Sequence, residues 1–251
     1  MNFVKLSEKS RVPTDVKYIN PRVTFDGINW WISVGVECQP DTNISGINTD
    51  GMGIDVGLKD LATCSNKVVY KNINKTPEVR RQKKRKSKLQ GKISRKYQMN
   101  KEGESYKKTS NIIKSEKQLL KINQRLTGIR HNHIHHATSE IIKQKPSYIV
   151  LEDLNVSGMM KNKHLAKAVQ EQGLYEFSRQ MQYKCNWNSI EFIEADRYYP
   201  SSKKCCVCGN IKKDLKLSDR VYKCDECGNE IDRDYQASIN LKRYVDVVGS
   251  G

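Results

Sequence analysis

The sequence predicts an α/β fold that carries a long helical insertion and a small cysteine-rich unit near its C-terminus. Three observations lead to this prediction. Short apolar runs at 51–58, 148–154 and 190–195 are typical of buried strands. The long segment between the first two runs has almost no strand-forming residues and shows helical spacing of its apolar side chains. Two Cys-x-x-Cys pairs, separated by 15 residues, match the spacing of a four-thiolate zinc site; they are Cys205, Cys208, Cys224 and Cys227.

Length and composition limit the class of protein. At 251 residues the chain is long enough for one sizeable core and a small satellite domain. No apolar run reaches the roughly 18 residues that cross a bilayer, and the first residues do not form a signal peptide. The cysteines that are not in metal-spaced pairs are scattered, which indicates reduced thiols. We therefore expect a cytoplasmic protein with no membrane partner.

The positive charge is concentrated in one segment. The net charge is +17, and residues 71–130 contain 20 of the 45 Lys and Arg but only 4 of the 28 Asp and Glu. The rest of the chain is therefore almost neutral. This distribution predicts a polyanion-binding surface; the alternative is a solvated helical face.

The first fifty residues have the pattern of β structure. Residues 22–25 and 30–36 flank Asp26-Gly27, which is a hairpin-type turn signal. A single hairpin cannot bury both of its faces, so it either joins the next sheet or belongs to a small barrel.

The strand at 51–58 contains one carboxylate, Asp55, in apolar surroundings. A buried carboxylate needs a proton or a cation, and a metal ion is the natural partner, although Asp55 could equally cap a turn. Gly53 and Gly57 leave room for a backbone or a phosphate to approach closely. A second strand is predicted from Ala62 to Tyr70.

Two helices are predicted in the basic segment, at 78–99 and 107–145, with a break near Gly103. They form an antiparallel hairpin with one strongly basic arm. Four histidines lie on the second helix, at 131, 133, 135 and 136. They could bind a metal, but a simple polar face explains them better.

A second carboxylate, Glu152, ends the apolar strand at 148–154, where open α/β sheets place their chemistry. A helix at about 164–186 and the strand at 190–195 follow. After the cysteine pairs, a final helix starts at Asp234, and either Asp232 or Asp234 is a candidate N-terminal cap.

Asp55, Glu152 and Asp234 together satisfy the needs of a two-metal phosphodiester nuclease. Clustered carboxylates repel one another unless divalent ions lie between them, and oxygen ligands favour Mg²⁺ or Mn²⁺. Zinc held by four thiolates has no open coordination position, so the cysteine unit is structural or contacts nucleic acid.

Several motifs resemble those of the TnpB (OrfB) family of transposon-encoded RNA-guided DNA nucleases, which are relatives of type V CRISPR effectors. They are Gly53-Ile54-Asp55-Val56-Gly57-Leu58, Leu151-Glu152-Asp153-Leu154-Asn155-Val156, Ser201-Ser202-Lys203 and Asp232-Arg233-Asp234. The resemblance covers about residues 50–245. It implies an RNase H-like RuvC domain in which Asp55, Glu152 and Asp234 bind the catalytic metal, with Asp232 as second choice for the last acid.

The resemblance also implies a domain organisation. We expect the end of a WED-like barrel at 1–48, RuvC parts at 49–75, 146–203 and 230–246, a basic helical hairpin at 76–145, a zinc ribbon at 204–229 and a tail at 247–251. Guide RNA and target DNA are the implied partners, contacted through their backbones. The expected contact residues on the basic arm are Arg80, Arg81, Lys83, Lys84, Arg85, Lys86, Lys88, Lys92, Arg95 and Lys96.

Two departures from the family pattern change the expectations. Gln236 stands where the family usually has Asn. Only the last barrel strands match, at about 1–45, so we expect a nuclease-half form whose partner is a second copy or a separate N-terminal half. The alternative function is a cleavage-inactive truncated remnant or a guide-dependent DNA-binding regulator; a plain zinc-ribbon module would leave Asp55 and Glu152 without a purpose.

Overall fold

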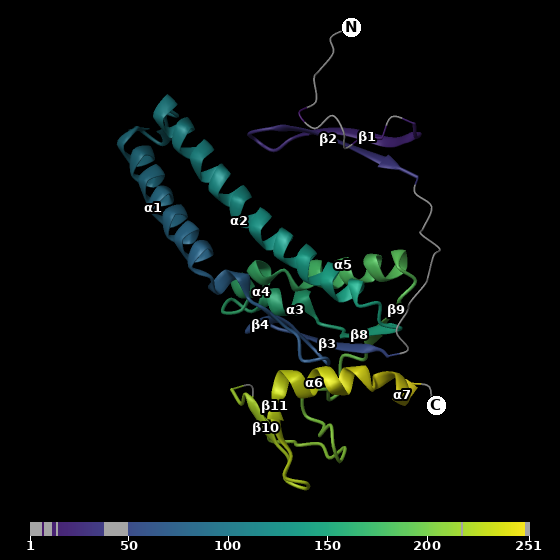
Figure 1. Cartoon of the computed structure of the whole chain (residues 1–251). Coiled ribbons are helices and arrows are strands. Elements are labelled where there is room, and N and C mark those ends of the chain that lie inside the picture. The colour runs from purple at the N-terminus through teal and green to yellow at the C-terminus, as the bar shows by residue number, and fades with distance from the viewer. Residues whose placement is uncertain (1–6, 8–11, 14, 38–49, 217, 249–251) are drawn as a thin grey trace.

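The structure is a computed structural model and describes residues 7, 12–13, 15–37, 50–216 and 218–248 (Figure 1). Cys38 lies outside these residues, as does much of the segment predicted to end a barrel.

The elements are, in order, β1 (Tyr18–Phe25), β2 (Trp30–Val36), β3 (Met52–Val56), β4 (Asp60–Cys64), β5 (Val69–Lys71), a 3₁₀ turn (Ile73–Lys75), α1 (Pro77–Met99), β6 (Lys101–Glu102), β7 (Ser105–Tyr106), α2 (Ser110–Lys143), β8 (Tyr148–Glu152), α3 (Val156–Lys161), α4 (Ala166–Gln172), α5 (Leu174–Trp187), β9 (Glu191–Ala195), β10 (Val221–Lys223), β11 (Glu230–Asp232), α6 (Arg233–Lys242) and α7 (Tyr244–Val248). None of the described helices is both long enough and apolar enough to cross a membrane.

Five strands form one mixed sheet with the order β5-β4-β3-β8-β9. Strands β3, β4 and β5 are antiparallel neighbours, whereas β8 runs parallel to β3 and β9 parallel to β8. A parallel neighbour needs a crossover connection, and α1 and α2 lie in the connection from β5 to β8. The α/β fold predicted from the sequence is therefore confirmed.

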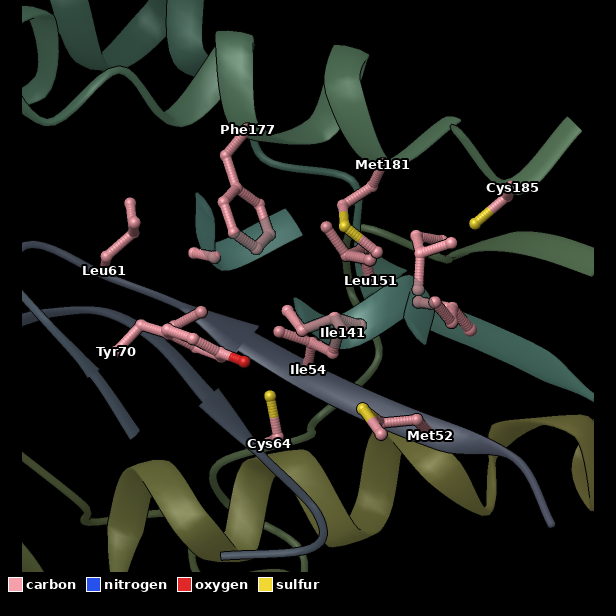
Figure 2. Close-up of a cluster of buried hydrophobic side chains, with 14 of the residues drawn as sticks. Met52, Ile54, Leu61, Cys64, Tyr70, Ile141, Leu151, Phe177, Met181 and Cys185 are labelled. Carbon is pink, nitrogen blue, oxygen red and sulfur yellow. The ribbon is translucent and has the colours of Figure 1, made fainter. Parts of the chain in front are cut away.

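Helices cover the two faces of this sheet (Figure 1). On one face, Ile54 and Leu151 of the sheet pack against Ile141 of α2 and against Phe177 and Met181 of α5 (Figure 2). These side chains are almost completely buried, and removal of their apolar surface from water stabilises this layer.

On the opposite face, Val150 and Ala195 pack against Leu241 of α6. The sheet is thus the middle layer of three. The continuous apolar run of β8 suits this position, because both faces of the strand are covered.

The basic segment contains two long helices. Helices α1 and α2 are antiparallel neighbours that share a small apolar cluster, which includes Val79, Ile122 and Leu126. Gly103, with φ of +61°, makes the turn between the short strands β6 and β7. The rest of α1 is polar, because only one narrow stripe of the helix meets a neighbour.

The first hairpin, β1–β2, forms as predicted but does not join the main sheet. It contacts α2 through Gln124, whose side-chain amide donates to the carbonyl of Asp26 at 3.2 Å. Trp30 and Trp31 remain 72% and 52% exposed, so the hairpin leaves most of its apolar surface in solvent.

Two sequence predictions are wrong in detail. The helix predicted at 164–186 is divided into α4 and α5 at Gly173, which has φ of +72° and ends α4 in a left-handed cap. The strand predicted from Ala62 to Tyr70 is divided into β4 and β5 by a turn at 65–68, where Lys67 has φ of +71°. A local left-handed residue causes each division.

Gly53 in β3 allows the backbone of α6 to approach the sheet closely. A Cβ atom at this position would lie 2.1 Å from the carbonyl oxygen of Ser238 and 2.2 Å from the amide nitrogen of Lys242. The sequence left open whether a backbone or a phosphate approaches Gly53. In the structure, the backbone of α6 does so.

Gly53→Ala should therefore lower the free energy of unfolding by about 2–3 kcal/mol, because neither backbone can move without disturbing the core. Urea denaturation followed by circular dichroism measures this loss. Gly91→Ala is the matched control: its Cβ would meet nothing within 4 Å in the middle of α1, so it should stabilise by about 0.5–1 kcal/mol. If Gly53→Ala leaves the free energy of unfolding unchanged, the close approach of α6 to β3 is contradicted.

Candidate functional site

The register of β3 and β8 brings two of the predicted acids to the same face of the sheet. Ile54 and Leu151 are register partners in these parallel strands, and both point into the core beneath α2 and α5. Side chains alternate along a strand, so the next residues, Asp55 and Glu152, point to the opposite face. That is the face on which α6 lies.

Helix α6 adds the third acid. Asp234 is in its first turn, where the positive end of the helix dipole stabilises a carboxylate. Asp232 is the N-terminal cap, and its Oδ1 accepts hydrogen bonds of 3.0 Å from the backbone N–H groups of Asp234 and Tyr235. The structure thus gives the capping role to Asp232 and leaves Asp234 to face the other two acids.

Asp55, Glu152 and Asp234 line a single pocket of about 340 Å³. The pocket also has five cationic side chains on its wall: Lys59, Lys203, Lys216, Arg220 and Arg233. An acidic floor with a basic rim suits a ligand that carries both metal ions and phosphate groups. Lys203 and Arg233 belong to motifs quoted from the sequence; Lys59, Lys216 and Arg220 were not predicted, because the segments that bring them here are far apart in the chain.

The acids lie in an environment that disfavours their charge. Burial raises the pKa of the Asp55 carboxyl well above its ordinary range, and the carboxylates of Glu152 and Asp234 raise it further. Burial also raises the pKa of Glu152. Among the described residues, no lysine or arginine lies within ion-pair distance of Asp55, whereas Asp234 pairs with Arg233 at 3.5 Å and with Lys59 at 3.9 Å. A buried carboxylate without a partner is costly, so a cation fits here.

This arrangement predicts a pH dependence of stability in metal-free protein. A carboxyl whose folded pKa is raised contributes stability that is complete below its unfolded pKa, near 4, and is lost as the pH rises through the folded value. Asp55→Asn removes that loss, so in EDTA at pH 8 the variant should be about 1–2 kcal/mol more stable than the parent. Thermal melts from pH 5 to 8 test this prediction, and Asp60→Asn, at a half-buried carboxylate, is the control. An equal change of melting temperature with pH in the parent and in Asp55→Asn would contradict the prediction.

A hydrogen-bond network orients Glu152. The Ser201 hydroxyl donates to Glu152 Oε1, and Ser201 is itself buried. Its loop is held by α6, because Asn240 Nδ2 donates to the carbonyls of Ser201 at 2.7 Å and Lys204 at 2.6 Å. Gln236, the residue that departs from the family pattern, is fully buried and donates to the carbonyl of Ser202 at 3.4 Å. It therefore supports this loop from outside the pocket wall.

The four predicted zinc ligands come together. The Sγ atoms of Cys205 and Cys227 are 3.6 Å apart, those of Cys208 and Cys224 are 3.5 Å apart, and all four lie within 4.8 Å of one another. A tetrahedral ion with Zn–S bonds of about 2.3 Å has S···S edges of about 3.8 Å, so the thiols fit a metal such as zinc. The backbone N–H of Cys227 lowers the pKa of Cys224 to about 6, which favours the thiolate that a metal needs.

The carboxylates are less tightly grouped than the cysteines. Within the described ranges, the cysteine set alone has three or more metal-ligating atoms mutually within 4.8 Å. The four histidines of α2 do not form such a set; His131 instead lies 3.3 Å from Glu176 and packs its ring on His135. The polar-face interpretation of the histidines agrees with this arrangement.

Seven of the ten basic residues expected to contact nucleic acid are exposed on α1: Arg80, Arg81, Lys84, Arg85, Lys88, Lys92 and Arg95. Lys96 instead joins the two helices, because its ammonium group donates to Ser115 Oγ at 2.8 Å. Lys83 and Lys86 line a cleft of about 440 Å³ between α1, α2 and α4. Arg130 and Lys167 lie in the same cleft and were not predicted, since each is an ordinary helix-surface cation in the sequence.

Comparison with known proteins agrees with the resemblance drawn from the motifs. Residues 33–163 match the family OrfB_IS605, described as a probable transposase, and residues 175–241 match the Cas12f1-like TNB domain. A "Putative RNA-guided DNA endonuclease" of Streptomyces pristinaespiralis is 29% identical over 243 residues, which cover 93% of this chain and 57% of that protein. The CRISPR-associated endodeoxyribonuclease Cas12f1 of Sulfoacidibacillus thermotolerans is 24% identical over 228 residues and matches 84% of this chain.

The fold is also similar to a solved structure. A chain in a cryo-EM structure of a CRISPR-Cas12f ternary complex superposes with a TM-score of 0.57 at 17% identity, covering 85% of this chain and 42% of that one. The present chain spans only about half the length of the curated relatives it matches. Because the OrfB_IS605 match extends over more than half of its residues, the chain belongs to this family of probable transposases.

Proposed function

We propose that this chain is the nuclease part of a transposon-associated, RNA-guided DNA endonuclease that cleaves phosphodiester bonds. The observation that carries the proposal is the convergence of Asp55, Glu152 and Asp234 on one pocket from three distant segments. The mixed sheet with acids on its neighbouring parallel strands supports an RNase H-like RuvC domain, formed by residues 49–75, 146–203 and 230–246.

In the proposed mechanism, Asp55, Glu152 and Asp234 would hold two Mg²⁺ or Mn²⁺ ions. Such ions supply an activated water and neutralise charge on the leaving oxygen. The protein provides the geometry: Ser201 fixes the orientation of Glu152, and Asp232 fixes the first turn that presents Asp234. The cations of the rim, among them Lys203 and Arg220, would attract and position the phosphate backbone.

The four-cysteine unit at 204–229 is proposed to be a structural zinc ribbon. Four thiolates leave the ion no open position for substrate. The ribbon connects the Ser201 loop to α6, and backbone hydrogen bonds fasten both ends: Lys212 N–H donates to the Lys203 carbonyl at 3.0 Å, and Arg233 N–H donates to the Arg220 carbonyl at 2.9 Å. Its role would be to place Asp234.

The partners proposed for this chain are a guide RNA and target DNA. The exposed cations of α1 can track a phosphate backbone without reading bases. In the cleft between α1, α2 and α4, Lys83 and Arg130 are paired with Glu171, which leaves less positive charge there for a phosphate. A second copy of the chain, or a separate N-terminal half, would cover the exposed tryptophans of the β1–β2 hairpin.

The test is cleavage of labelled single-stranded and duplex DNA by the purified chain with an RNA from its own element, in Mg²⁺ and in EDTA. Cleavage in Mg²⁺ and none in EDTA is the expected result. Binding that persists in EDTA, without cleavage under any metal or guide, would instead favour the non-cleaving remnant or regulator.

Ser201→Ala should slow cleavage by about 10- to 100-fold, because residues that orient metal ligands typically contribute this much. The loop should keep its place through Asn240, so thermal stability should change little. Single-turnover rates measure the effect. Ser105→Ala is the control: it removes a hydroxyl in β7, in the turn of the α1–α2 hairpin, which is not part of the acidic pocket. Equal rates for the two variants would show that Ser201 does not position Glu152.

A further inference from the structure

One surface of α5 carries a stripe of side chains that the proposed chemistry does not use. Tyr175, Arg179, Tyr183 and Trp187 follow one another at intervals of four residues, so they lie along one ridge of the helix. The opposite side of α5 is buried against the sheet, through Phe177 and Met181 among others. Tyr175 and Trp187 are each 66% exposed, which is unusual for large aromatic side chains.

The stripe is held in shape before anything binds. Arg179 donates to both carboxylate oxygens of Glu176 at 2.8 Å, and its guanidinium lies 5.5 Å from the ring centre of Tyr183. The rings of Tyr183 and Trp187 are 4.8 Å apart. The side chains therefore lose little conformational freedom when a flat ligand stacks on them.

The N-terminal end of the stripe meets the proposed active site. Tyr175 and Arg179 line a second pocket, of about 250 Å³, whose lining also includes Glu152, Asp153 and Glu194. Glu152 also lines the pocket of the three acids, so the two hollows are adjacent. Asp153 is paired with Arg197 at 2.6 Å, which reduces its repulsion of a phosphate.

We propose that this stripe, Tyr175, Arg179, Tyr183 and Trp187, binds the unpaired bases of single-stranded nucleic acid and leads the strand to the acidic pocket. Alternating aromatic and arginine side chains suit bases of any sequence, because every base presents a flat π face. The basic segment at 71–130 gives the same chain a separate surface for the phosphates of such a strand. The route to Glu152 rests on the proposed nuclease function, whereas the base-binding surface does not.

The first test measures the affinity of the full chain for a fluorescent dT oligomer in EDTA, where cleavage cannot occur. Tyr175→Ala and Trp187→Ala should each weaken binding by about tenfold, and Trp187→Phe should restore most of the loss. The salt dependence of binding by these variants should match that of the parent, because they lose no contact to a phosphate. Lys88→Ala on α1 should instead reduce the salt dependence. Tyr106→Ala, which removes an exposed tyrosine at the far end of the α1–α2 hairpin, is the control.

The second test reports stacking directly and does not depend on how the alanine variants fold. With Trp30 and Trp31 replaced by phenylalanine, Trp187 is the one tryptophan left in the sequence. Its fluorescence should be quenched by oligomers of dT or U but not by an abasic oligomer of the same length. Comparison of dT with U shows whether the strand is DNA or RNA.

Three results would overturn the proposal. Quenching by the abasic oligomer, or an equal loss of affinity for duplex and single strand, would show that bases are not bound. Conversion of a dimer to a monomer by Trp187→Ala in sedimentation, with nucleic-acid affinity unchanged, would make the stripe an interface between copies. Because binding is measured without metal, failure here and failure of the nuclease proposal are distinguishable.

Discussion

Asp55→Ala should abolish DNA cleavage, with a loss of at least about a thousandfold in rate. Asp55 is deeply enclosed beside Glu152 and Asp234, and the favourable charge of Arg233 does not offset its burial and these two carboxylates. Its removal leaves the pocket without the central ligand for the proposed metal ions, and the loss of metal-based stabilisation is worth several kcal/mol. Single-turnover cleavage of labelled DNA in Mg²⁺ measures the effect.

The control for this variant is Asp60→Ala, which removes an acid on the adjacent strand β4 that pairs with Lys71 outside the pocket. It should cleave at nearly the parent rate. Nucleic-acid affinity should be the same in both variants, because the basic helix α1 is unchanged. Full cleavage by Asp55→Ala would refute the assignment of the three acids.

Loss of the metal proposed for the four-cysteine unit should also slow cleavage, although four thiolates would leave that ion no open position for substrate. Cys224→Ser removes one of four ligands, and a structural zinc site contributes most of the folding free energy of a unit this small. Without it, Arg220 and Asp232 lose their fixed relation to the pocket, and the first turn of α6 is no longer held. We expect cleavage to fall at least about a hundredfold while the sheet remains folded.

Three measurements separate this effect from general unfolding. Zinc content by emission spectroscopy should fall in Cys224→Ser and stay at one ion in Cys206→Ser, which changes a cysteine outside the set of four. Hydrogen exchange should increase in residues 205–235 and remain slow in β3 and β8. A variant that loses zinc and still cleaves at the parent rate would disprove the positioning role.

Much of the fold was predictable because it depends on local signals. Strong patterns gave the β1–β2 hairpin, the helices α1 and α2 and the cysteine set. The division at Gly173 was missed, because the residues around it suit a helix and a glycine inside such a segment need not end it. Here the left-handed φ of +72° ends α4, and a Cβ at this position would lie 2.8 Å from Ile134 Cδ1 of α2.

The candidate site was predictable in its residues but not in its arrangement. Carboxylates in apolar strands are costly, so Asp55 and Glu152 were conspicuous in the sequence. Their common face depends on the pairing of Ile54 with Leu151, which joins segments about a hundred residues apart. The stripe on α5 was missed because aromatic residues four apart are usually interpreted as core, and only the structure shows which side of the helix is buried.

The contact between Gly53 and α6 has a consequence for synthesis of the protein. The two partners are almost two hundred residues apart, and Asp234 is delivered by the later one. While the chain is still being translated, β3 and β8 can pair, but the third acid has not left the ribosome. Folding of such distant contacts comes late. A nascent chain can therefore complete the proposed metal site only after residues 233–242 emerge and dock.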